Sequence, residues 1–191
     1  MDRRLMLEWL VATGGLAAIK RLSADELAEF GARLHMRGDA GAAELLLSPD
    51  ELRTVTAVAE CIIPATETPG ATEAGVAAFV NVMLSDWYPA PDAERFRVGL
   101  RALDDLSQRR FGAAYADATA SRQVELAQEL DGEVAALRRR DPGAAAAHWF
   151  ATLKFLTVWG YCTSEVAMRQ VLKSYPRAMR YDGAAPARLP G

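Results

Sequence analysis

Apolar side chains recur along most of the chain at intervals of three and four residues, the spacing that places them on one face of a helix. The clearest run spans residues 73–88, with apolar positions at Val76, Phe79, Val80, Met83, Leu84 and Trp87. No stretch alternates polar and apolar residues for long enough to predict a sheet, and no internal repeat is present. The pattern therefore predicts an all-α protein, a compact orthogonal bundle of about six helices.

Local start and stop signals divide this pattern into separate helices. The strongest start combines Ser48 as N-cap, Pro49 at the first helical position and Glu51, which reaches back to the cap. It predicts a helix over residues 49–63 that ends at Pro64.

An earlier helix is predicted over residues 23–35, because Ser23 and Glu26 have the spacing of a capping box. A loop is expected after it, around Gly38 and Gly41.

The remaining helices are each bounded by a proline, a glycine or a capping residue. We expect them at residues 73–88, at 92–111 after Pro89 and Pro91, from Thr119 through Leu137, at 144–159 up to Gly160, and from a cap at Thr163 through Leu172 to Pro176. The helix at 144–159 is apolar on nearly all sides, which is typical of a central helix.

These signals organise the chain into four parts. Residues 1–21 are an export signal or an N-terminal helix, and residues 22–47 an N-terminal helix and loop. Residues 48–176 form the helical domain, and residues 177–191 an extended tail.

Composition and charge exclude several classes of protein. The 191 residues include 22 Lys+Arg and 25 Asp+Glu, a formal net charge of -3. This balance argues against a nucleic-acid binder, because such proteins neutralise phosphates with basic side chains. A hydrophobic share of 51% fits one globular domain with a packed core.

Paired arginines near the start, Arg3 and Arg4, precede a short apolar stretch. This start resembles a twin-arginine export signal, whose pathway carries proteins that are already folded. The stretch is too short for a stable transmembrane anchor, and Glu8 interrupts it. The alternative is an amphipathic first helix in which both arginines are solvated.

Motifs of several large enzyme classes are absent. The chain has no GxSxG, GxxxxGK[ST] or GxGxxG string. His35 and His148 lack HExxH or ExxH pairing, so His148 is interpreted as a core or interface residue with one hydrogen bond. Glu60 beside Cys61 is interpreted as an exposed carboxylate next to a buried thiol. No catalytic, cofactor-binding or metal-binding residue is predicted.

The two cysteines leave two interpretations open. Cys61 and Cys162 pair if the protein matures in an oxidising compartment, or they stay buried free thiols, which export of a folded chain favours. The aromatic residues near the end of the chain predict a core, or an anchor surface for a partner, in preference to a cofactor pocket. They are Trp149, Phe155, Trp159 and Tyr161.

Four segments are distinctive as strings. They are the start at Arg3-Arg4, the helix end at residues 52–64, the turn at residues 66–71 that leads into Gly75-Val76, and residues 155–165. Residues 63–70 read Ile-Pro-Ala-Thr-Glu-Thr-Pro-Gly, and residues 160–165 read Gly-Tyr-Cys-Thr-Ser-Glu. Together they resemble the gluconate 2-dehydrogenase subunit 3 family, small subunits of flavin-dependent sugar dehydrogenase complexes. The resemblance covers residues 48–182 and the signal, and Cys162 stands where the family pattern has phenylalanine.

The resemblance implies a non-catalytic subunit of a periplasmic complex. In such complexes a large FAD-dependent subunit of the glucose-methanol-choline type oxidises a sugar or polyol, and a cytochrome c subunit with haem c takes up the electrons. The small subunit binds the flavoprotein, assists its maturation and supplies the export signal, here Arg3 and Arg4. It is expected to hold no cofactor itself, and to meet the inner membrane only through the complex or its N-terminal segment.

Contacts with that partner are expected in irregular segments between helices, because such segments frequently carry recognition. The residues expected at this interface are Glu67, Pro69, Trp159, Tyr161, Thr163, Ser164 and Glu165.

Two functions of other classes stay open. One is a stand-alone structural or regulatory helical protein whose N-terminus is merely a helix. The other is a metal-binding helical enzyme, which needs clustered Glu and His ligands on facing helices that two histidines do not supply.

Overall fold

The computed structural model describes residues 24–39 and 46–172. These residues form helices α2 (Ala24–Asp39), α3 (Pro49–Ile62), α4 (Val76–Asp86), α5 (Ala90–Phe111), α6 (Ala120–Arg140), α7 (Pro142–Ala146), α8 (Trp149–Thr163) and α9 (Glu165–Gln170), with a 3-10 turn η2 (Tyr115–Asp117). No strand occurs within them. Six of the helices have 11 or more residues, so the predicted all-α bundle of about six helices is confirmed.

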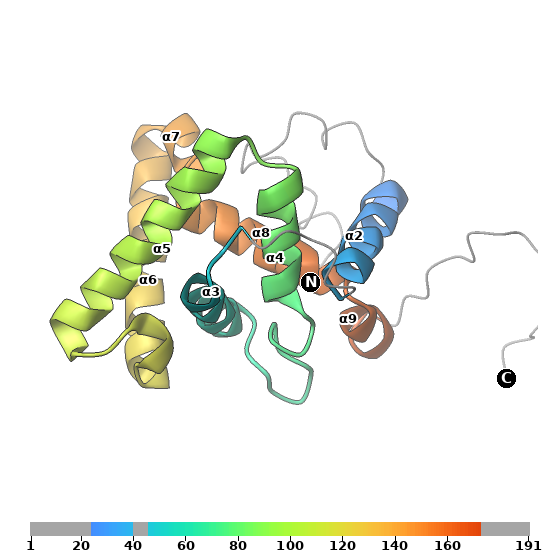
Figure 1. The fold of residues 1–191 in the computed structure, drawn as a ribbon, viewed down its shortest axis with the longest axis horizontal. Helices are drawn as coiled ribbons and strands as arrows, with labels where there is room; N and C mark the ends of the chain where they lie inside the picture. Colours follow the sequence, from blue (N-terminus) through green and yellow to red (C-terminus); the bar gives the residue numbers. More distant parts are fainter. Residues whose placement is uncertain (1–23, 40–45, 173–191) are drawn as a thin grey trace, which may run out of the picture.

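Helix α8 lies at the centre of the bundle. It runs across the molecule and crosses the upright α4 (Figure 1), and it packs against every other α-helix of the described part of the chain. This central position agrees with the prediction that the segment is apolar on nearly all sides. A helix without a polar face is stable only where other helices cover it on all sides. None of the described helices is long and apolar enough to cross a membrane.

The core is formed mainly by α4 and α8. Phe79, Val80 and Met83 of α4 are fully buried, as are Leu153 and Leu156 of α8. Helix α2 closes one side of this core, because its Leu34 is buried in the same apolar cluster. Residues from the predicted N-terminal helix and from the predicted helical domain therefore share one core.

Glycine permits the close approach of helices to α8. A Cβ atom on Gly160 would lie 2.8 Å from Cδ1 of Phe79 on α4. A Cβ atom on Gly99 of α5 would overlap the indole ring of Trp149 at the start of α8. Gly160 was predicted to end the central helix, but it lies inside α8. Helix α4 can approach α8 this closely because glycine has no side chain.

The segment predicted as one helix over residues 144–159 is divided in two. Pro142 begins the short α7, the chain turns at Ala147, and His148 caps α8 by accepting a hydrogen bond at Nδ1 from the N–H of Phe150 at 3.2 Å. Burial lowers the pKa of His148, and the nearby carboxylate of Glu133 opposes this effect. The neutral imidazole keeps the lone pair that the cap needs.

The last cap and the end of α2 also differ from the prediction. Ser164 rather than Thr163 caps α9, and Thr163 is the last residue of α8. Helix α2 continues through Gly38 to Asp39, because Arg37 in its last turn pairs with Asp86 at the end of α4, at 3.2 Å. The predicted cap Ser23, the loop residue Gly41 and residues 173–191 lie outside the described residues.

Helices α4 and α5 begin at other residues than predicted. Residues 71–75 form a turn, and Gly75 with φ 68° precedes α4 at Val76. Helix α5 begins at Ala90, because Pro89 is its N-cap and Pro91 lies in the first turn, where the N–H that proline lacks would have no helical partner.

A buried carboxylate joins α3 to α5. Glu51 is 5% exposed, completes the predicted capping box with Ser48, and accepts hydrogen bonds from Arg97 at 3.1 Å and Arg101 at 3.2 Å. Burial raises the pKa of this carboxyl, but the Ser48 N–H and the two guanidinium groups outweigh burial and hold the pKa below its usual value.

A second polar contact joins the same two helices. Asp104 of α5 accepts hydrogen bonds from the hydroxyl of Thr54 on α3, at 3.0 Å, and from the N–H of Tyr115 in η2, also at 3.0 Å. These directional bonds orient α3 on the bundle more narrowly than apolar packing alone.

Replacing Gly99 by alanine is expected to lower the free energy of unfolding by about 1–3 kcal/mol, because the added methyl group meets the Trp149 ring. Urea unfolding measures the loss. The matched control is Gly132→Ala in α6, where nothing lies within 4 Å and the change is expected to stabilise by up to about 1 kcal/mol. Equal effects at the two sites would contradict the packing role of Gly99.

Glu51→Gln is expected to lower the free energy of unfolding by about 1.5–3 kcal/mol at pH 7, because the charge-assisted bonds to the arginines weaken while the glutamine can still cap. A carboxyl whose pKa is lowered on folding stabilises the protein above its unfolded pKa, and this contribution is lost as the pH falls through the folded value. The difference from the unmodified protein should therefore shrink below about pH 4.5. A difference independent of pH in urea titrations would contradict this account.

Candidate functional site

The two distinctive strings near residues 63–70 and 160–165 lie against each other in the structure. The hydroxyl of Tyr161, in the last turn of α8, donates a hydrogen bond to the carbonyl oxygen of Pro69 at 2.7 Å. Burial raises the pKa of this phenol, so the hydroxyl keeps the proton that it donates. This bond joins α8 to the segment between α3 and α4, residues 63–75, which we call the α3–α4 loop (Figure 1).

The α3–α4 loop begins where Pro64 stops α3. The N–H of Ile63 still bonds to Ala59 at 2.9 Å, and the carbonyl of Ile63 accepts from the N–H of Ala71, also at 2.9 Å. The second bond closes the loop at its base. The residues between these two positions therefore project as one compact unit.

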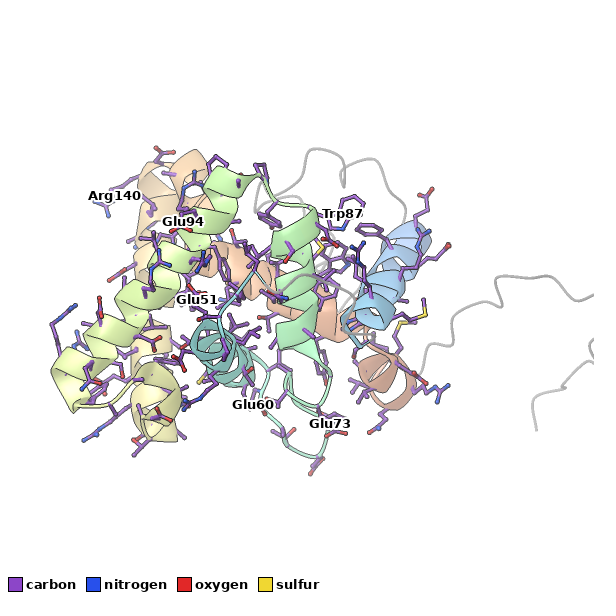
Figure 2. All side chains as sticks on the ribbon, viewed as in Figure 1. Glu51, Glu60, Glu73, Trp87, Glu94 and Arg140 are labelled. Atoms are coloured by element: carbon purple, nitrogen blue, oxygen red, sulfur yellow. The ribbon has the colours of Figure 1, made fainter. Side chains whose placement is uncertain are left out.

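Glu60 of α3 holds the loop by hydrogen bonds to both of its limbs. Its carboxylate accepts hydrogen bonds from the N–H of Ala65 at 2.7 Å, and from the N–H and hydroxyl of Thr72 at 2.9 and 2.6 Å. Burial raises the pKa of Glu60, but the three bonds outweigh burial and lower it overall. Figure 2 shows Glu60, near the end of α3, and Glu73, on the second limb of the loop, at the same end of the bundle.

Gly70 is required by this arrangement. A Cβ atom at this position would meet the Glu60 carboxylate and lie 2.6 Å from the backbone nitrogen of Ala65. The base of the loop thus packs directly on the carboxylate that holds it.

The loop has a buried base and an exposed tip. Residues 69–71 are buried, whereas residues 64–68 are all exposed. Within the tip, the N–H of Thr66 donates to the carbonyl of Thr68 at 3.0 Å, which tightens the turn. An exposed loop whose limbs are held by hydrogen bonds presents its side chains in defined positions, an arrangement that suits recognition of another molecule.

The predicted interface residues divide by exposure. Glu67 is exposed on the tip, and Glu165 is exposed and pairs with Arg169 at 2.8 Å. The other five are buried and support the local fold: Pro69, Trp159, Tyr161, Thr163 and Ser164. Contact with a partner stays a prediction for this region, and the exposed members are those that a partner reaches directly.

Each buried residue of the second string has a structural partner. The Thr163 hydroxyl donates to the carbonyl of Trp159 at 2.9 Å, and the Ser164 hydroxyl donates to that of Tyr161 at 2.8 Å. Trp159 is 1% exposed and packs edge-on against Phe79, with ring centroids 5.3 Å apart. Its indole nitrogen has no hydrogen-bond partner among the described residues, where the ring contributes apolar packing.

The histidines form hydrogen bonds with the backbone, and the cysteines are partly buried. His35 donates from Nε2 to the carbonyl of Gly160 at 2.7 Å, and His148 is the cap of α8. Cys61 and Cys162 are both free, and burial raises the pKa of each thiol, so both stay protonated near neutral pH. Among the described residues, no three His, Cys, Asp or Glu side chains gather in a way that could hold a metal ion.

A shallow recess of about 440 Å³ lies beside the loop, between α3 and the start of α6. Its polar lining residues already have partners: Glu60 holds the loop, Arg53 pairs with Asp117, and Gln123 donates to the carbonyl of Tyr115 at 2.9 Å. These groups are committed to internal contacts, so the recess does not have the convergent free polar groups of an active site.

The sequence prediction missed the role of Glu60. The residue was interpreted as an exposed carboxylate beside Cys61, yet it holds both limbs of the α3–α4 loop. One signal was present: a glutamate in the last turn of a helix that Pro64 terminates lies close to the free N–H groups of the following loop.

Tyr161→Phe is expected to lower the free energy of unfolding by about 1 kcal/mol, because the carbonyl of Pro69 loses its donor. Amide hydrogen exchange in residues 63–72 should accelerate as the base of the loop loosens. The matched control is Tyr88→Phe, since the buried Tyr88 hydroxyl has no hydrogen-bond partner in the part of the chain that the structure describes, and its removal should cost no stability. Unchanged loop exchange in Tyr161→Phe would refute the anchoring role.

Comparison with known proteins gives one result. The family model described as gluconate 2-dehydrogenase subunit 3 matches residues 49–181, more than half of the chain and all of it from α3 to α9. Neither the curated proteins nor the solved structures gave a match. Both distinctive strings, and the bond between Tyr161 and Pro69 that joins them, lie inside the matched range.

Proposed function

The chain belongs to the gluconate 2-dehydrogenase subunit 3 family, and we propose that it is the non-catalytic small subunit of a periplasmic, FAD-dependent sugar or polyol dehydrogenase complex. The family match carries this proposal, because it spans the bundle from α3 onward and names a subunit of a dehydrogenase complex. The catalytic subunit holds FAD and oxidises the substrate, and a cytochrome c subunit with haem c accepts the electrons.

A role in binding fits the chemistry of the described residues. Glu51, Glu60 and Asp104 accept hydrogen bonds that hold helices and a loop, and the two thiols are protonated. These groups serve the scaffold. Redox chemistry in the complex is therefore assigned to cofactors held by the partner subunits.

In this proposal the N-terminal segment is the export signal. Arg3 and Arg4, which lie outside the described residues, act as a twin-arginine signal for both subunits. Because that pathway carries folded proteins, a flavoprotein without its own signal acquires FAD in the cytoplasm and crosses while bound to this chain. A contact that survives transit needs a partly apolar interface of about 2,000 Å² or more.

Exposed apolar side chains are available for such an interface. Trp87, at the C-cap of α4, is 48% exposed, and its ring packs edge-on against Phe30 with centroids 4.8 Å apart. Met36 on α2 is 63% exposed. Large apolar and aromatic side chains of this kind are favoured in the centre of protein interfaces.

The test is affinity purification of the full chain, tagged at its C-terminus, from the periplasm of its native host. We expect a larger protein with flavin absorbance to co-elute. With both Arg3 and Arg4 changed to lysine, the two proteins should be recovered together from the cytoplasm instead, because the signal is lost while the contact is kept.

Arg139→Lys with Arg140→Lys is the matched control, since it changes a second arginine pair at the exposed end of α6. Export should be unaffected in this variant. A colourless chain that elutes alone from the cytoplasm would contradict the proposed function and favour a stand-alone helical protein. Unchanged export of the Arg3, Arg4 variant would contradict the signal alone.

A further inference from the structure

The tip of the α3–α4 loop, residues 64–68, is held in place before any partner binds. Three hydrogen bonds to Glu60 and one from Tyr161 fix the limbs and base of the loop, while all five tip residues are exposed. Ordering a flexible loop on binding costs conformational entropy, and a preformed loop avoids most of that cost. The buried contacts therefore favour tight recognition by the exposed residues.

The tip lies in a long acidic segment without cations. Residues 54–94 contain no lysine, arginine or histidine. Their acidic residues are Glu60, Glu67, Glu73, Asp86, Asp92 and Glu94. Four of these six have partners in the chain: Glu60 bonds to the loop, and Asp86, Asp92 and Glu94 each pair with an arginine. In the part of the chain that the structure describes, Glu67 and Glu73 form no ion pair.

The backbone of the tip also has unused hydrogen-bonding groups. The Thr66 N–H bonds to the Thr68 carbonyl, but within the described structure the N–H of Glu67 has no acceptor in the chain. A neighbouring carboxylate, a free N–H and exposed threonine hydroxyls form a small polar surface. A surface of this kind suits a concave polar site on a partner, because each of its groups has a specific direction.

We propose that residues 64–68 are the element with which this chain docks on the catalytic flavoprotein subunit, entering a polar recess that places a lysine or arginine against Glu67. This proposal rests on the proposed function, since that subunit is the partner. Glu60 and Tyr161 are positioning residues, because they hold the tip without touching the partner. The basic group on the partner completes the ion pair that Glu67 lacks among the described residues.

Charge complementarity decides the kind of partner surface. An apolar recess would bury the Glu67 carboxylate without compensation, which is costly. An acidic recess would repel both Glu67 and Glu73. A basic, polar recess is the surface that pairs the charge and satisfies the backbone of the tip.

The experiment compares Glu67→Lys with the unmodified full chain in the native host, and measures flavin recovered per mole of tagged chain. Reversal of a charge opposite a cation should lower recovery by at least about tenfold at physiological salt. The thermal unfolding midpoint of the purified chain should not change, because Glu67 is exposed and forms no ion pair with another described residue. Glu133→Lys, at an exposed glutamate of α6, is the matched control and should retain the flavoprotein.

Hydrogen exchange on the purified unmodified complex gives a second, independent readout. The peptide that contains residues 63–70 should be protected in the complex relative to the free chain. Absence of this protection overturns the proposal, whatever the stability of the variants. Equal flavin recovery with Glu67→Lys and the unmodified chain also overturns it.

Failure of the proposed function would give a different experimental result from failure of the docking proposal. If the unmodified chain retrieves no flavoprotein, the subunit assignment is wrong and the docking proposal falls with it. If the unmodified chain retrieves the flavoprotein and Glu67→Lys does so equally well, the assignment stands and docking by residues 64–68 is refuted.

Discussion

Helix α8 contacts every other α-helix of the described residues, so the side chains along it set the spacing of the bundle. Two contacts at the ends of α8 leave no room for a Cβ atom: Gly99 of α5 against Trp149, and Gly160 of α8 against Phe79. Protein interiors are close-packed, and a helix that must approach its neighbours this closely has few alternative positions. The position of α8 in turn places Tyr161, in its last turn, beside the loop between α3 and α4.

The shape of the α3–α4 loop depends on this packing. Tyr161 holds the loop from α8, and Glu60 holds it from α3, so its shape depends on how these two helices lie relative to each other. The orientation of α3 depends in turn on the buried carboxylate of Glu51 with its two arginines, and on Asp104. Directional polar contacts and close apolar packing together support one exposed segment, residues 64–68.

The chemistry of the described chain is that of a scaffold. Both histidines serve the backbone, one as the cap of α8 and one as a donor to the carbonyl of Gly160, and both thiols are held protonated by burial. Membership of a dehydrogenase subunit family is compatible with such a chain, to which the proposed function assigns a binding role. The α3–α4 loop adds an exposed carboxylate, Glu67, that forms no ion pair with another described residue.

The sequence by itself determined the all-α class, the capping box at Ser48 and Glu51, the end of α5 at Phe111 and the central place of α8, because each follows from local backbone preference or from the pattern of apolar residues. The paired arginines are likewise a property of the sequence alone. Only the tertiary structure decided that Gly160 lies within a helix, that His148 divides the 144–159 segment, and that Trp159 and Tyr161 are buried supports. These features depend on contacts between residues that are distant in the sequence, or on where a complete helix lies in the bundle. The α3–α4 loop shows the same limit, since its anchor Tyr161 lies 92 residues from Pro69.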